Sequence, residues 1–86
     1  MARYRVEISR TAERQFRKLG ADDRRRVAQA MLALGDDPHP IGSRKLTGYK
    51  DVYRIRVGVF RILYSVEGRQ LIVIVLKIGH RKDVYR

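Results

Sequence analysis

The segment YRIRVGVFRILY, residues 53–64, decides the fold, because it holds two alternating stretches of apolar and basic residues around one glycine. A two-residue turn at Gly58 and Val59 joins the two stretches as an antiparallel hairpin, with Val57 opposite Phe60. The sequence therefore predicts two short strands whose register is fixed by the turn between them.

This register gathers arginines on one face of the hairpin. Arg54 and Arg56 alternate away from the apolar side chains of their strand, and Arg56 stands opposite Arg61. Like charges directly opposite each other destabilise a hairpin by up to about 1 kcal/mol, and no acidic residue shares that face. A solvated face kept soluble by charge is one interpretation. The other is a phosphate-binding surface, because guanidinium groups bind phosphate through paired hydrogen bonds.

The part of the chain before the hairpin predicts one strand and two helices. Residues 3–8, RYRVEI, alternate as a half-buried strand does. Ser9 is a suitable cap for a helix that ends near Gly20, and a second helix starts near Asp22 and stops near Gly35. Apolar residues recur along one side of each helix, so the pair is expected to form an antiparallel helical hairpin.

Three strands in quick succession complete the predicted fold, at about residues 52–57, 60–66 and 71–78. Connections this short require antiparallel hairpins. The predicted order is β-α-α-β-β-β, in which the helical hairpin packs on one face of a small, mainly antiparallel sheet. We expect this α+β fold to form a single domain over residues 1–86.

Charge and composition indicate the kind of partner. Twenty Lys and Arg against nine Asp and Glu give a net charge of +11, which favours binding to polyanions. The chain has no cysteine, so disulfides and thiolate metal sites are excluded. Its N-terminus lacks an apolar signal core, and the longest apolar run, LIVIVL, is too short to span a bilayer. We expect a soluble cytoplasmic protein that needs no cofactor.

The arginines suit RNA cleavage, which requires no metal ion. The 2′-hydroxyl attacks the adjacent phosphorus while one group takes its proton, another protonates the leaving oxygen and cations stabilise the phosphate. The candidate cations are Arg54, Arg56, Arg61 and Arg81. Tyr85 is the candidate proton acceptor, because nearby cations favour its phenolate form.

The two histidines and the remaining cations have weaker roles. His80 is a possible additional proton donor, whereas His39, between two prolines, is expected to be structural or exposed. Two histidines without adjacent carboxylates predict no metal site. Candidate residues for attachment to RNA or the ribosome, unless they are ordinary solvated cations, are Arg14, Arg17, Lys18, Arg24, Arg25, Arg26, Arg44, Lys45, Lys77 and Lys82.

Two segments together resemble the RelE/ParE superfamily of toxins from type II toxin–antitoxin systems, and its RelE branch in particular. They are KLTGYKDVYRIRVGVFRILY, residues 45–64, and VLKIGHRKDVYR, residues 75–86. The resemblance covers essentially the whole chain. It implies an mRNA interferase that cuts mRNA in the ribosomal A site without metal and so inhibits translation. It also implies a cognate antitoxin, whose acidic or amphipathic segment wraps the toxin and blocks its site.

The resemblance also implies roles for individual residues. Two lysines of the RelE branch fall on Arg54 and Arg56, and an arginine of the next strand falls on Arg61. The arginine after the final glycine falls on Arg81, and the tyrosine of the tail falls on Tyr85, after a shorter intervening segment. Arginine releases a proton far less readily than lysine, so these substitutions keep charge stabilisation and weaken any role in proton transfer.

Two other functions fit the sequence. The ParE-like branch inhibits DNA gyrase by binding it, and its members are not nucleases. A non-catalytic RNA-binding module is the second alternative. The basic cluster and the tail tyrosine favour the nuclease, because all five positions carry suitable groups.

Overall fold

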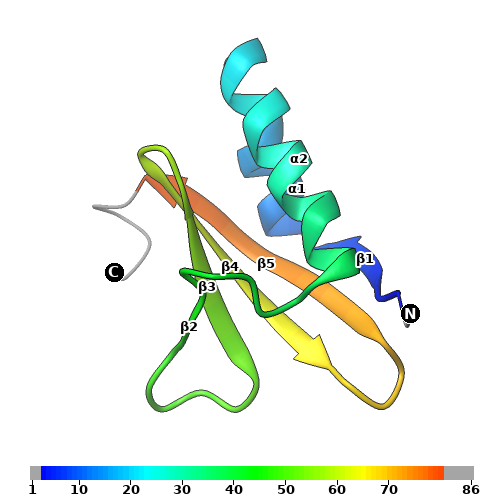
Figure 1. Cartoon of the computed structure of the whole chain (residues 1–86). Coiled ribbons are helices and arrows are strands. Elements are labelled where there is room, and N and C mark those ends of the chain that lie inside the picture. Colours follow the sequence, from blue (N-terminus) through cyan, green and yellow to red (C-terminus); the bar gives the residue numbers. More distant parts are fainter. Residues whose placement is uncertain (1–2, 81–86) are drawn as a thin grey trace.

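The computed structural model describes residues 3–80, in which two helices cover one face of a five-stranded sheet (Figure 1). The elements are β1 (Arg5–Ile8), α1 (Arg10–Arg17), α2 (Ala21–Asp36), β2 (Arg44–Lys45), β3 (Val52–Val57), β4 (Phe60–Glu67) and β5 (Ile72–His80). The sheet order is β1-β5-β4-β3-β2, and only the β1–β5 pair is parallel. The predicted α+β fold is confirmed, with β2 as an additional short strand. No helix within residues 3–80 is long and apolar enough to cross a membrane.

The β3–β4 hairpin has the predicted register. Val57 pairs with Phe60, and Arg56 pairs with Arg61. Gly58 has a φ of 60°, a left-handed conformation that glycine adopts without the steric cost of a side chain. The two-residue turn therefore fixes which side chains face each other.

The core lies between the helices and the sheet. Alternation along β3 and β4 turns Ile55, Ile62 and Tyr64 inward, and each is at most 7% exposed. The other buried apolar residues are Ala12, Val27, Leu34, Val73, Val75 and Ile78. Burial of one sheet face leaves the opposite face, which carries the arginines, available to solvent.

Side chains of α1 bind the edge of β5 where that strand extends past β1. Ser9 caps α1, as predicted: its hydroxyl accepts a hydrogen bond from the N–H of Ala12 at 3.1 Å and donates one to the carbonyl of Leu76 at 2.9 Å. The N–H of Ile78 donates to Oε1 of Gln15 at 2.7 Å. This edge of the sheet is therefore satisfied by side chains instead of a strand.

A cluster of rings anchors the loop between α2 and β2. The Tyr64 hydroxyl donates to the carbonyl of Pro38 at 2.7 Å. Tyr53 stacks on Tyr64 with ring centroids 5.9 Å apart, and His39 meets Tyr53 edge-on at 4.8 Å. His39 was expected to be structural or exposed, and its exposed side chain makes this one ring contact. Burial raises the pKa of Tyr64 to about 12, so this phenol stays protonated.

The raised pKa of Tyr64 predicts a loss of stability at alkaline pH. Between pH 10 and about 12 the folded state keeps a phenol proton that the unfolded chain loses. The free energy of unfolding should fall over this range, by about 2 kcal/mol more in the wild type than in Tyr64→Phe. Unfolding in urea at a series of pH values measures the free energy of unfolding of the wild type and of Tyr64→Phe. Parallel pH profiles for the two proteins would contradict the prediction.

Candidate functional site

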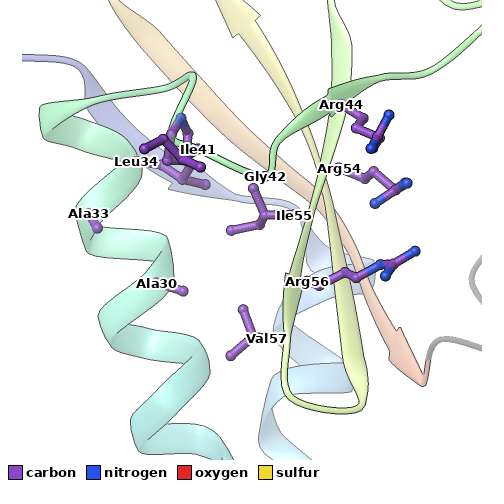
Figure 2. Close-up of a pocket in the computed structure, with 11 residues that line it drawn as sticks. Ala30, Ala33, Leu34, Ile41, Gly42, Arg44, Arg54, Ile55, Arg56 and Val57 are labelled. Atoms are coloured by element: carbon purple, nitrogen blue, oxygen red, sulfur yellow. The ribbon is translucent and has the colours of Figure 1, made fainter.

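The candidate site is the sheet face that points away from the helices. We call it the arginine face and define it by Arg44, Arg54, Arg56, Arg61 and Lys77. In Figure 2 the side chains of Arg44, Arg54 and Arg56 lie one after another on the side of β3 away from α2. The face thus combines cations from four neighbouring strands.

The sheet register arranges these cations in two rows that run across the strands. Arg44 pairs with Arg54, Arg54 with Leu63, and Leu63 with Lys77, which gives the first row. In the second row Arg56 pairs with Arg61, and Arg61 with Gly79. Neighbouring strands lie about 4.8 Å apart, and residues two apart along a strand are separated by about 6.7 Å. An anion of phosphate size on this face therefore meets several cations at once.

Three cations of this face, Arg44, Arg54 and Arg56, stand apart from the salt bridges found among residues 3–80. The salt bridges among residues 3–80 are Arg3–Asp36, Arg5–Glu7, Arg17–Glu13 and Arg25–Asp22. Within that range Arg44, Arg54 and Arg56 belong to no salt bridge. Because like charges repel at this spacing, binding of an anion relieves an unfavourable interaction in the folded protein.

A groove of about 620 Å³ lies beside the first row of cations. A register shift between Leu63 and Tyr64 makes Leu76 an extra residue of β5, so Leu76 lines this groove beside Lys77. Leu63 also lines it, and Tyr49 contributes an exposed ring from the β2–β3 loop. The groove therefore offers apolar and aromatic surface beside cations, a combination that suits a nucleotide.

Most cations of the helices lie apart from the arginine face. Arg17 pairs with Glu13 at 3.2 Å, and Arg25 pairs with Asp22 at 3.3 Å. The other predicted helix cations, all exposed, are Arg14, Lys18, Arg24 and Arg26. Arg26 lies near the β3–β4 turn, because a methyl group on Gly58 would lie 4.0 Å from its Nη1. The structure therefore separates the helix cations from the predicted site.

Of the predicted proton-transfer groups, only His80 lies within the described residues. His80 pairs with Phe60, and the two rings meet edge-on with centroids 6.3 Å apart. Strand alternation places His80 on the side opposite Arg61, which pairs with Gly79. The remaining predicted residues of the tail, Arg81, Lys82 and Tyr85, lie outside the described residues.

The comparisons with known proteins identify the family. Residues 6–85 match the family described as the ParE toxin of type II toxin–antitoxin system, parDE. The chain belongs to this family. A RelE-like toxin protein of Escherichia coli is 38% identical over 96% of this chain and 90% of its own length. Toxin RelG of Mycobacterium tuberculosis is 33% identical over 96% of this chain and 97% of its own length.

Solved structures of toxin–antitoxin complexes have the same fold. The archaeal RelE–RelB complex from Pyrococcus horikoshii matches with a TM-score of 0.83 and 29% identity, covering 98% of this chain and all of that one. The intact RelBE complex of Escherichia coli matches with a TM-score of 0.79 and 25% identity, over 90% and 95% of the two chains. The protein is a toxin of a type II toxin–antitoxin system, and both of these neighbours were solved in complex with their antitoxins.

Some features of the toxin's site were not apparent in its sequence. Arg44 and Lys77 were expected only as general RNA contacts, and the register brings both into one row with Arg54. The only sequence signal for the position of Arg44 was the basic pair that it forms with Lys45. This pair lies in a loop rich in Pro and Gly, where no alternation of residues predicts a strand. Within residues 3–80 no three His, Cys, Asp or Glu gather as a metal site.

Proposed function

We propose that the toxin is a ribosome-dependent endoribonuclease that cleaves mRNA in the A site and so inhibits translation in the cytoplasm. The observation that carries the proposal is the arginine face, whose two rows of cations lie on a rigid sheet without acidic partners for Arg44, Arg54 or Arg56 among residues 3–80. The RelE relatives support it, because metal-independent cleavage of mRNA is what the resemblance to the RelE branch implies.

The arginines in this proposal act on the phosphate that reacts. As the 2′-oxygen attacks phosphorus, negative charge grows on the phosphate oxygens, and Arg54, Arg56 and Arg61 stabilise it. Guanidinium groups stay protonated at physiological pH, so these residues bind charge and do not transfer protons. We assign proton abstraction to Tyr85 and further charge stabilisation to Arg81. His80 remains a possible proton donor only if it turns toward the face that carries Arg61.

The groove beside the first row provides room for a neighbouring nucleotide. Its apolar residues, Leu63 and Leu76, suit the flat surface of a base, and the exposed ring of Tyr49 is available for stacking. Arg54 and Lys77 line the same groove and can hold a phosphate beside that base. The helix cations, which lie elsewhere, are proposed to contact the ribosome.

Mapping of mRNA 5′ ends in a translating extract tests the function. With the wild-type toxin we expect cuts within A-site codons and 2′,3′-cyclic phosphate on the upstream fragments. Tyr85→Phe should remove at least about 99% of this cleavage, because the phenol that takes the proton is gone. Arg14→Ala, on the exposed surface of α1, is the control for a cation outside the site and should keep the cleavage positions.

Intact mRNA in the presence of the wild-type toxin would overturn the nuclease. The match to a family described as a ParE toxin makes inhibition of DNA gyrase the second candidate. A supercoiling assay with purified gyrase distinguishes them, because a nuclease leaves supercoiling unchanged. Binding to RNA without either effect would leave a non-catalytic RNA-binding protein.

A further inference from the structure

The side chains of β5 exchange sides of the sheet at one point along the strand. Val75 is fully buried, and strict alternation from it would turn Lys77 into the core. The register shift makes Leu76 an extra residue, so the next buried side chain is that of Ile78, which is 1% exposed. Lys77 therefore lies on the arginine face, where it pairs with Leu63.

Two hydrogen bonds from the helical layer hold this irregular part of β5. The Ser9 hydroxyl donates to the carbonyl of Leu76 at 2.9 Å, on the extra residue itself. The N–H of Ile78 donates to Oε1 of Gln15 at 2.7 Å. The two bonds lie on either side of Lys77 in the sequence, so its backbone is fixed from both directions. Bulges are common next to active sites, where they redirect a side chain.

The redirected lysine completes a ring of four cations around Leu63. Lys77 is its neighbour on β5, and Arg54 is its neighbour on β3. Arg61 precedes Leu63 by two residues on β4, and Arg56 pairs with Arg61. Strand spacing and residue rise place the Cα atoms of Lys77 and Arg61 about 8 Å apart. A phosphate above Leu63 is therefore within reach of all four side chains.

The cleavage proposed for this face needs a proton donor that its arginines cannot supply. When the bond between phosphorus and the 5′-oxygen breaks, its electron pair goes to that oxygen, which takes up a proton as it leaves. The guanidinium groups of Arg54, Arg56 and Arg61 do not release their protons. Strand alternation places His80 on the other side of the sheet. A lysine ammonium group has three protons and is able to donate one.

We propose that Lys77 is a catalytic residue that protonates the leaving 5′-oxygen. The inference rests on the proposed nuclease and supplies its acid. Tyr85 takes the proton of the 2′-hydroxyl, the 2′-oxygen bonds to phosphorus, and the bond from phosphorus to the 5′-oxygen breaks. That oxygen takes one proton from Nζ of Lys77. The products are a 2′,3′-cyclic phosphate and a 5′-hydroxyl, and proton exchange with water restores both side chains.

Two other titratable side chains line the groove beside the first row, Lys45 and Tyr49. Lys45 pairs with Tyr53, whose ring belongs to the cluster on the helix side, so alternation directs Lys45 to that side. Tyr49 belongs to the β2–β3 loop, at the end of β3 away from Arg56. Lys77 is the member of this group that the register places beside the phosphate.

Lys77→Arg tests proton donation, because it keeps the positive charge and removes the transferable proton. In a single-turnover assay on programmed ribosomes, this variant should cleave ordinary mRNA about 100-fold more slowly than the wild type does. Lys50→Arg makes the same exchange in the exposed turn before β3, and its rate should stay within about twofold of the wild-type rate.

An mRNA with sulfur in place of the 5′-oxygen at the cleaved linkage separates proton donation from charge. A thiolate leaves without being protonated, so Lys77→Arg should cleave this linkage within about threefold of the wild-type rate. Tyr85→Phe should remain slow on both mRNAs, because the 2′-hydroxyl still has to lose its proton. Recovery with sulfur also shows that Lys77→Arg is folded and reaches the ribosome.

Two outcomes would overturn the role of Lys77 and leave the nuclease in place. One is a wild-type rate for Lys77→Arg on ordinary mRNA, since Lys77 would then supply charge alone. The other is an equal loss of rate on the oxygen and sulfur linkages, which would make Lys77 a residue that positions the RNA. If the wild-type toxin leaves ordinary mRNA intact, the nuclease itself is contradicted, and this inference with it.

Discussion

Arg61→Ala should lower the rate of mRNA cleavage by about 100-fold or more while leaving ribosome affinity within about threefold. Arg61 is half-buried on β4, opposite Arg56 and beside Gly79, so its position is set by the sheet. In the proposed cleavage, a cation held there stabilises charge that appears only as the phosphate reacts, so its loss should affect the chemical step more than binding. Single-turnover cleavage on programmed ribosomes and a separate ribosome-binding assay measure the two effects.

Two matched variants complete this experiment. Arg61→Lys keeps the charge and loses the planar guanidinium, so part of the rate should return. Arg25→Ala removes an exposed arginine from α2, where it pairs with Asp22, and should not change the rate of the chemical step. If Arg61→Ala lowers affinity as much as rate, the residue serves attachment, and the arginine face would be a binding surface without catalysis.

Of the predicted substitutions, Gly35→Ala should have the largest effect on stability. It should lower the free energy of unfolding by about 1–3 kcal/mol. Gly35 lies near the end of α2, and its carbonyl accepts a hydrogen bond from the N–H of Tyr4 at 2.7 Å. A methyl group there would lie 2.9 Å from the Tyr4 carbonyl oxygen and 3.2 Å from Cγ2 of Val6. The first contact is with backbone, so β1 would have to move away from the helix.

Equilibrium unfolding in urea measures this change. Gly68→Ala is the control, since its added methyl group meets nothing within 4 Å, and its stability should change by less than about 0.5 kcal/mol. Replacing glycine by alanine inside a helix ordinarily stabilises it by up to about 1 kcal/mol. If Gly35→Ala also stabilises the toxin, the approach of β1 to α2 is looser than the structure shows.

The hairpin could be predicted from the sequence because its information is local. Gly58 fixes the turn, alternation fixes the two faces, and together they place Arg56 opposite Arg61. The helices could also be predicted, since Ser9 is a cap and the apolar spacing is regular. The arginine part of the candidate site followed from these two local patterns. Its proposed tail residue, Tyr85, rests on its spacing after Arg81 and on the resemblance to the RelE branch.

The rest of the site depends on contacts between distant residues. β2 has only two residues, too few for a periodic pattern, so the pairing of Arg44 with Arg54 was not predictable. The register shift after Leu63, which makes Leu76 an extra residue of β5, has no local signal either. That register also determines on which side of the sheet the His80 side chain lies. Alternation along β5 alone could not predict that side.

The bonds from α1 to β5 also determine when the fold can form during synthesis. Ser9 bonds Leu76 and Gln15 bonds Ile78, across 67 and 63 positions of sequence, and β1 has β5 as its neighbouring strand. Residues near the N-terminus are synthesised first, but they can form these contacts only after β5, at the end of the described chain, has been made. A nascent chain that still lacks β5 cannot assemble this sheet, so the arginine face of the toxin is incomplete until β5 has emerged.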